Sequence, residues 1–106
     1  MNSMPLACDM NVFTPSEREQ HVQGAANLLQ SLQGVQAVMN GFEFTFPNDS
    51  EIVTRLTEFI SKERRCCPFL EFTLKFVPNY ESVSLTIAGP EGTQDFLREE
   101  FSEAFV

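Results

Sequence analysis

Apolar residues return with two different periods along this 106-residue chain. Across residues 22–32 and 52–60 they recur every three or four positions, which is the spacing of one helix face. Across residues 42–46, 70–76 and 83–87 they alternate with polar residues, which indicates strands. Alternation rather than a continuous apolar run predicts a sheet that is covered on one face only.

Capping residues mark where the helices should begin. Thr14 precedes Pro15, and a glutamate follows three residues after Thr14, so a helix is expected to start there. Asn48 and Glu51 have the same relationship, which predicts a second capping box with Asn48 as the cap. The first helical stretch is expected to bury Val22, Ala25, Ala26, Leu29 and Leu32.

Turn signals separate these elements. Asn40-Gly41 predicts a hairpin turn between strands at 35–39 and 42–46, and Pro78-Asn79 predicts a second turn. The second helix is expected to end near Cys66, because a residue that precedes proline is disfavoured in helical dihedral angles. A last helix, from residue 91 or 93 to 104, should turn Leu97, Phe101 and Ala104 inward and Glu99, Glu100 and Glu103 outward.

The expected fold is a single α+β domain over residues 1–106, with an irregular leader at 1–11. The order helix, hairpin, helix, hairpin, helix predicts a two-layer sandwich in which the helices pack on one face of a mostly antiparallel four-stranded sheet. The open face is expected to be solvated, or alternatively to form a homodimer or partner surface. Its expected residues are Glu43, Thr45, Glu71, Thr73, Lys75, Ser84 and Thr86.

The formal charge of −8 repels phosphate backbones and anionic lipid headgroups, so we expect neither nucleic acid nor membrane as a partner. No apolar run approaches the ~18 residues of a membrane span. The opening residues M-N-S-M-P-L-A-C-D-M lack the charged and apolar regions of a secretory signal, so the expected location is cytoplasmic. Three cysteines in a reducing compartment favour ligands, reactive thiols or core packing over a disulfide framework.

The candidate site is the sequence E-R-R-C-C-P-F-L-E-F at residues 63–72. Glu63 continues the apolar face of its helix and precedes Cys66 by three positions, which places a carboxylate beside sulfur. The alternative is that its head pairs with an arginine such as Arg18 or Arg98. The helix C-terminus opposes a thiolate while nearby cations favour it, so no strongly lowered thiol pKa is expected.

Metal binding is the chemistry that these cysteines favour. A disulfide between Cys66 and Cys67 is unfavourable because neighbouring α-carbons lie only about 3.8 Å apart. Cys8 could supply a third sulfur, and Glu63 or His21 could join it; thiolates select soft or borderline ions such as Zn²⁺, Cu⁺ or mercury. The alternatives are a buried, packing role for the cysteines and a helix-surface position for His21.

Several strings resemble a group of small bacterial proteins that share an E-R-x-C-C-P-F-L-x-F signature. They are A-C-D, S-E-R-E-Q-H, F-E-F-T-F-P, E-R-R-C-C-P-F-L-E-F and L-T-I-A-G-P-E-G-T-Q-D-F-L, and the likeness covers about residues 7–100. We associate this group loosely with loci for mercury or other heavy-metal handling. The resemblance implies that Cys8, Glu63, Cys66 and Cys67 are the functional positions.

The leading hypothesis is therefore a small cytoplasmic binding protein, not an enzyme, whose cysteines hold a soft metal ion or another thiophilic ligand. A second hypothesis is a homodimeric interaction module with structural cysteines. A third is a thiol enzyme, with Cys66 or Cys67 as nucleophile and His21 or Glu63 as base. The leading hypothesis depends on whether the leader brings Cys8 to the cysteine pair; if it does not, only a structural role for the cysteines remains.

Overall fold

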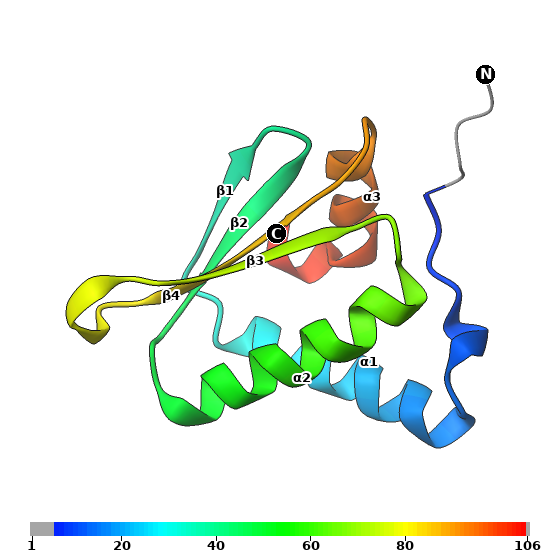
Figure 1. The fold of residues 1–106 in the computed structure, drawn as a ribbon, viewed down its shortest axis with the longest axis horizontal. Coiled ribbons are helices and arrows are strands. Elements are labelled where there is room, and N and C mark those ends of the chain that lie inside the picture. Colours follow the sequence, from blue (N-terminus) through cyan, green and yellow to red (C-terminus); the bar gives the residue numbers. More distant parts are fainter. Residues whose placement is uncertain (1–5, 106) are drawn as a thin grey trace.

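The computed structural model describes residues 6–105, and these form three α-helices and one four-stranded sheet (Figure 1). The expected α+β class is confirmed. None of the described helices combines the length and the apolar character that crossing a membrane requires. The elements are α1 (Pro15–Gln30), β1 (Gly34–Val38), β2 (Gly41–Phe46), α2 (Ser50–Cys66), β3 (Glu71–Phe76), β4 (Val83–Ala88) and α3 (Thr93–Glu100), with short 3-10 turns at Met10–Val12, Pro78–Tyr80 and Ser102–Phe105.

The sheet is antiparallel throughout, with the strand order β1-β2-β4-β3. Leu85 of β4 lies opposite Phe44 of β2 on one side and opposite Leu74 of β3 on the other. The last strand in the chain is thus an inner strand, and β1 and β3 are the edges. The alternation pattern predicted the strands and the antiparallel pairing, whereas the strand order comes from the structure.

The core lies between one face of the central strands and the helices. Alternate residues of β2 and β4 are buried, and they share a cluster with Leu28 of α1 and with Leu56 and Phe59 of α2. In Figure 1, α1 and α2 lie side by side along the sheet. The buried strand residues in this cluster are Phe42, Phe44, Phe46, Val83, Leu85 and Ile87.

The caps and the first turn differ in detail from the predictions. Thr14 and Glu17 form the expected capping box, but the cap of α2 is Asp49, whose Oδ1 accepts the Ile52 N–H at 2.9 Å. The first hairpin turns at residues 39–40, one position earlier than expected. Gly41 is already in β2, and a side chain cannot replace it there, because a Cβ would overlap the backbone carbonyl oxygen of Ile87.

Two helices also depart from the predicted pattern. The most buried positions of α1 are His21 and Leu28, which the prediction did not include, whereas Val22 is 58% exposed. The predicted Ala25, Leu29 and Leu32 are partly buried and pack against the core. The last helix ends at Glu100, and Phe101 then packs into the core as the chain changes to a 3-10 turn. The helix is therefore four residues shorter than the predicted one, which was expected to continue to residue 104.

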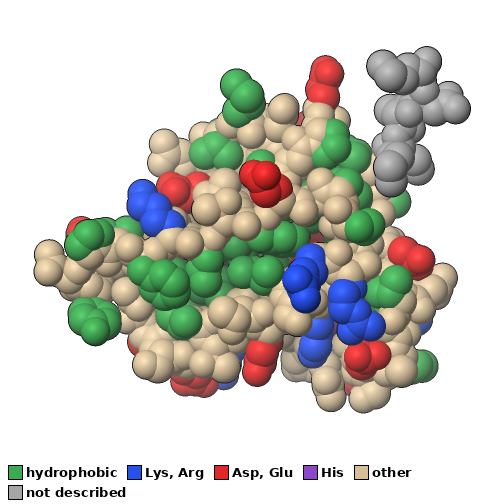
Figure 2. Space-filling view, viewed as in Figure 1, with side chains coloured by type: hydrophobic (Ala, Val, Ile, Leu, Met, Phe, Trp, Pro, Cys, Tyr) green, Lys and Arg blue, Asp and Glu red, His purple; other side chains and the backbone are tan. Residues whose placement is uncertain are grey.

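The predicted leader at residues 1–11 is described from Leu6 onward; its first five residues lie outside the described part. From Leu6 it runs past the C-terminal end of α2 before it enters α1 (Figure 1). The Asp9 N–H donates to the Cys66 carbonyl at 2.7 Å, and Phe13 is buried in the core. On the face shown in Figure 2, basic side chains gather over α2 and apolar side chains along β3.

Candidate functional site

The end of α2 brings the two neighbouring cysteines together. Cys66 is the last residue of the helix, and Cys67 has non-helical dihedral angles (φ −125°, ψ 70°), as expected for a residue before proline. Consecutive side chains on a helix would point about 100° apart. Because Cys67 leaves the helix, its Sγ lies only 3.6 Å from the Sγ of Cys66.

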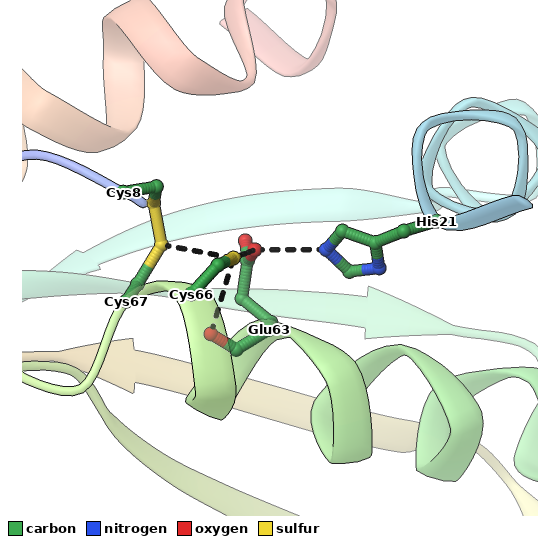
Figure 3. The surroundings of a disulfide bond; sticks show 5 residues. All are labelled: Cys8, His21, Glu63, Cys66 and Cys67. Atoms are coloured by element: carbon green, nitrogen blue, oxygen red, sulfur yellow. Dashed lines mark hydrogen bonds and ion pairs between the residues drawn. A yellow bond between two sulfur atoms is a disulfide. The ribbon is translucent and has the colours of Figure 1, made fainter. Parts of the chain in front are cut away.

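Cys8 joins this pair from the leader. Its α-carbon lies 4.5 Å from that of Cys67, although 59 residues separate them in the sequence, and the two form a disulfide (Figure 3). The predicted convergence of Cys8, Cys66 and Cys67, here called the sulfur cluster, is confirmed. The expectation that these cysteines would not form a disulfide is wrong for Cys8 and Cys67, because the leader brings them within bridging distance.

A carboxylate and an imidazole extend the sulfur cluster into the core. The Cys66 thiol donates to Glu63 Oε1 at 3.1 Å, and His21 Nε2 lies 2.9 Å from the same oxygen (Figure 3). Glu63 is 2% exposed. The alternative prediction that an arginine pairs with Glu63 is wrong, since its partner is His21 while Arg98 pairs with Asp95.

His21 is buried, which corrects its interpretation as a helix-surface residue. It is 5% exposed, and its ring lies 5.3 Å from the ring of Phe13 and 5.4 Å from that of Phe59. The sequence did carry a signal for this position. His21 precedes Ala25 by four residues and Leu28 by seven, and these three residues share one helix face.

The second oxygen of Glu63 has no hydrogen-bond partner among residues 6–105. The Glu63 side chain lies at a hollow of about 190 Å³, whose lining includes Met10, His21, Glu100 and Phe101. A buried carboxylate oxygen without a donor is costly. This oxygen is therefore the atom of the site best placed to accept a bond from a cation, a water molecule or a ligand group.

Electrostatics keep the free thiol protonated. Burial, the hydrogen bond to Glu63 and the charge of Glu63 together raise the pKa of Cys66 from about 9.0 to about 12. Arg65 does not offset this, because it pairs with Glu17 and lies over the Phe13 ring. The arrangement therefore disfavours Cys66 as a free thiolate nucleophile.

Glu100 is a site residue that the sequence analysis did not identify. It is exposed, as expected for a residue that points outward from the last helix, but it also lines the hollow beside Glu63 and a second hollow beside Cys8. Desolvation raises the pKa of Glu100, and the charge of Glu63 raises it further. No local pattern distinguishes Glu100 from its neighbour Glu99, because only the tertiary packing of α3 against the leader gives it this position.

Four groups are close enough to share one ion. One ligand atom each from Cys8, Glu63, Cys66 and Cys67 lies within 4.8 Å of all the others. His21 is not part of this set, but its Nε2 lies 2.9 Å from Oε1 of Glu63. The four groups thus bring together three sulfurs, two of them bonded in the disulfide, and one carboxylate oxygen whose position is fixed by a histidine.

Comparisons of the chain with models of protein families, with curated proteins and with solved structures find no match. The functional argument therefore depends on the residues of the site.

Proposed function

We propose that the protein is a small binding protein that holds a soft metal ion, or another thiophilic ligand, between its sulfur cluster and Glu63. One observation carries the proposal: three sulfurs and a buried carboxylate, from the leader and from the end of α2, converge within 4.8 Å. Core packing alone does not need a carboxylate at that place, since burying a charged group without full compensation is unfavourable. A ligand that bonds to the sulfurs and to the carboxylate explains why these four residues lie together.

Sulfur spacing supports a metal ligand. Zinc–sulfur bonds are about 2.3 Å long, so two sulfurs on one tetrahedral zinc ion lie about 3.8 Å apart. The sulfurs of Cys66 and Cys67 are 3.6 Å apart, which already approximates that separation. Little movement of α2 is needed to bind an ion there.

The donor set selects the class of ion. Thiolates favour zinc, copper(I) and heavy metals such as mercury over calcium or magnesium. His21 holds one oxygen of Glu63, as the outer partners of metal ligands commonly do, and leaves the other oxygen without a protein donor. The resemblance to proteins associated with heavy-metal loci agrees with this choice. The negative charge of the chain also favours cations.

The binding form is the reduced protein. In the disulfide form, Cys8 and Cys67 are bonded to each other, and neither can act as a thiolate. Reduction leaves three thiols, and metal binding displaces their protons because the ligand is the thiolate. The predicted cytoplasmic location, which we retain as part of this proposal, would keep the thiols available.

A titration tests the proposal. Chain purified under reducing, chelator-free conditions is titrated with Hg²⁺ and with Zn²⁺ after the reductant is removed under nitrogen, and compared with the double variant Cys66→Ser/Cys67→Ser. We expect one tightly bound ion per wild-type chain and at least a hundredfold loss of affinity in the variant. The control is Glu51→Gln, an exposed change at the other end of α2, which should bind as the wild type does. Equally weak binding by all three proteins would refute the proposal.

A homodimer through the open face of the predicted two-layer sandwich is the second candidate. Ser84 lies on that face, yet it is nearly buried and its Oγ has no hydrogen-bond partner within residues 6–105. A second copy could supply that partner. Sedimentation equilibrium over a wide concentration range tests this candidate, and a monomer at every concentration would exclude it.

A further inference from the structure

We infer that the Cys8–Cys67 disulfide is opened by small thiols that attack Cys8, and that this exchange switches on the proposed metal site. The part concerning the metal rests on the proposed function; the part concerning thiol exchange does not. The substrate is a low-molecular-weight thiol, and charge at the entrance favours a neutral or cationic thiol over an anionic one.

Access selects Cys8 as the sulfur that is attacked. Cys67 is 0% exposed, whereas Cys8 is only partly buried and lines a hollow of about 350 Å³ between the leader and α3. This space, the Cys8 hollow, is also lined by Leu6, Ala7, Met10, Phe96, Glu99 and Glu100. Exchange requires direct approach of a thiolate to one sulfur, so the reaction should enter at Cys8.

The exchange balances in two steps. A thiol RSH gives a thiolate that bonds to the Cys8 sulfur, the Cys8–Cys67 bond breaks, and Cys67 leaves with the bonding electrons and takes up the proton. A second RSH then attacks the mixed disulfide, releases RSSR and leaves Cys8 as a thiol. Two electrons pass from two RSH molecules to the protein. Cys66 does not compete by bridging to Cys67, because neighbouring α-carbons are too close for an unstrained disulfide.

Non-covalent contacts keep the leader in place after reduction. The Asp9 N–H still donates to the Cys66 carbonyl at 2.7 Å, and Arg65 Nη2 donates to the Val12 carbonyl at 3.1 Å. Phe13 is anchored in the core with the Arg65 guanidinium 5.1 Å above its ring. Asp9 precedes and Phe13 follows the 3-10 turn at Met10–Val12, so the leader is held at both ends of this turn. The reduced Cys8 therefore remains beside Cys66 and Cys67.

Reduction therefore changes the number of ligands without dismantling the site. The disulfide form offers Cys66 and Glu63, and the reduced form offers all four groups. In a reducing compartment, disulfides are typically transient and are used for catalysis or redox sensing. The Cys8–Cys67 disulfide has one accessible sulfur and lies beside Glu63 and Cys66, so it is suited to redox sensing.

Two thiols of similar size test the exchange. Oxidised, metal-free protein is treated with cysteamine, which is cationic, and with 3-mercaptopropionate, which is anionic, at equal thiolate concentration. The reaction is quenched by acid and alkylation, and the adduct is mapped by mass spectrometry. We expect the mixed disulfide at Cys8, and a rate for cysteamine at least fivefold higher because Glu99 and Glu100 repel the anion. Adduct at Cys67, or reduction no faster than global unfolding, would overturn the inference.

Variants separate local charge from overall charge. Glu99→Gln should narrow the difference in rate between the two thiols, whereas Glu81→Gln, an exposed change between β3 and β4 at the opposite end of the molecule from the leader (Figure 1), should leave it unchanged. An equal effect of both variants would contradict entry through the Cys8 hollow.

Metal binding by the two redox forms tests the switch. We expect the reduced protein to bind Hg²⁺ or Zn²⁺ at least a hundredfold more tightly than the oxidised protein. Equal binding by both forms would overturn the switch and leave the proposed function intact. Binding by neither form would refute the proposed function, while the site and rate of thiol attack would still decide the exchange.

Discussion

The Nε2 of His21 lies 2.9 Å from Oε1 of Glu63 inside the core, and the two residues are 42 positions apart in the chain. This contact joins α1 to the last turn of α2. The same Glu63 oxygen accepts a hydrogen bond from the Cys66 thiol. Because His21 holds this oxygen in place, the position of the Cys66 sulfur depends on a residue of another helix. The site is thus a connected set of buried polar groups, in which removing one member leaves the others without a partner.

Replacing Glu63 should destabilise the protein. Glu63→Ala leaves His21 and the Cys66 thiol without their acceptor in the core, and we expect the free energy of unfolding to fall by about 3 kcal/mol. Glu63→Gln retains an acceptor and should cost about half as much. Urea denaturation measures both changes. The control Glu51→Gln affects only an exposed ion pair and should stay within about 0.5 kcal/mol of the wild type.

The stability should fall in alkaline solution because of Cys66. Its pKa is raised from about 9.0 to about 12 in the folded protein, so the unfolded chain releases the thiol proton first as the pH rises. The contribution is complete below pH 9 and is lost progressively between pH 9 and pH 12, with a slope of up to about 1.4 kcal/mol per pH unit. Urea denaturation at several pH values should show this slope in the wild type and a smaller one in Cys66→Ala. Identical slopes in both proteins would show that the thiol is not responsible.

Arg65 should hold the leader, whereas its neighbour Arg64 should not. Arg65→Ala removes a hydrogen bond to the Val12 carbonyl and the contact above Phe13, so we expect a loss of about 1 kcal/mol in unfolding free energy. Arg64 is exposed and makes no hydrogen bond or ion pair within residues 6–105. Arg64→Ala should therefore change the stability by less than about 0.5 kcal/mol. Equal effects of the two changes would argue against this anchor.

Two glycines should respond in opposite directions to the same substitution. Gly41→Ala forces a methyl group against the Ile87 carbonyl and Ala88 of the neighbouring strand, and should cost about 3 kcal/mol or prevent folding. Gly24 lies inside α1, and a Cβ there meets nothing within 4 Å. Gly24→Ala should raise the unfolding free energy by up to about 1 kcal/mol, because alanine favours the helix more strongly. Thermal unfolding followed by circular dichroism distinguishes the two outcomes.

Local patterns predicted the elements well and the site only partly. Thr14 and the proline after Cys67 fixed a helix start and a helix end, since caps and proline act on dihedral angles within a few residues. Local patterns failed where two alternatives differ only by distant contacts. Asp49 is the cap of α2 in place of its neighbour Asn48. His21 is buried and Val22 is exposed, because contacts with the core decide which positions of a helix are buried.

The sequence by itself determined the α+β class, the antiparallel strands and the four candidate ligands Cys8, Glu63, Cys66 and Cys67, because these depend on periodicity, capping and residue chemistry. Only the tertiary structure decided that β4 lies between β2 and β3, that His21 holds Glu63, and that Cys8 bonds to Cys67. Each of these relationships joins residues that are far apart in the chain. Their formation depends on how the core packs and on where the leader crosses α2, and neither is encoded in a local pattern.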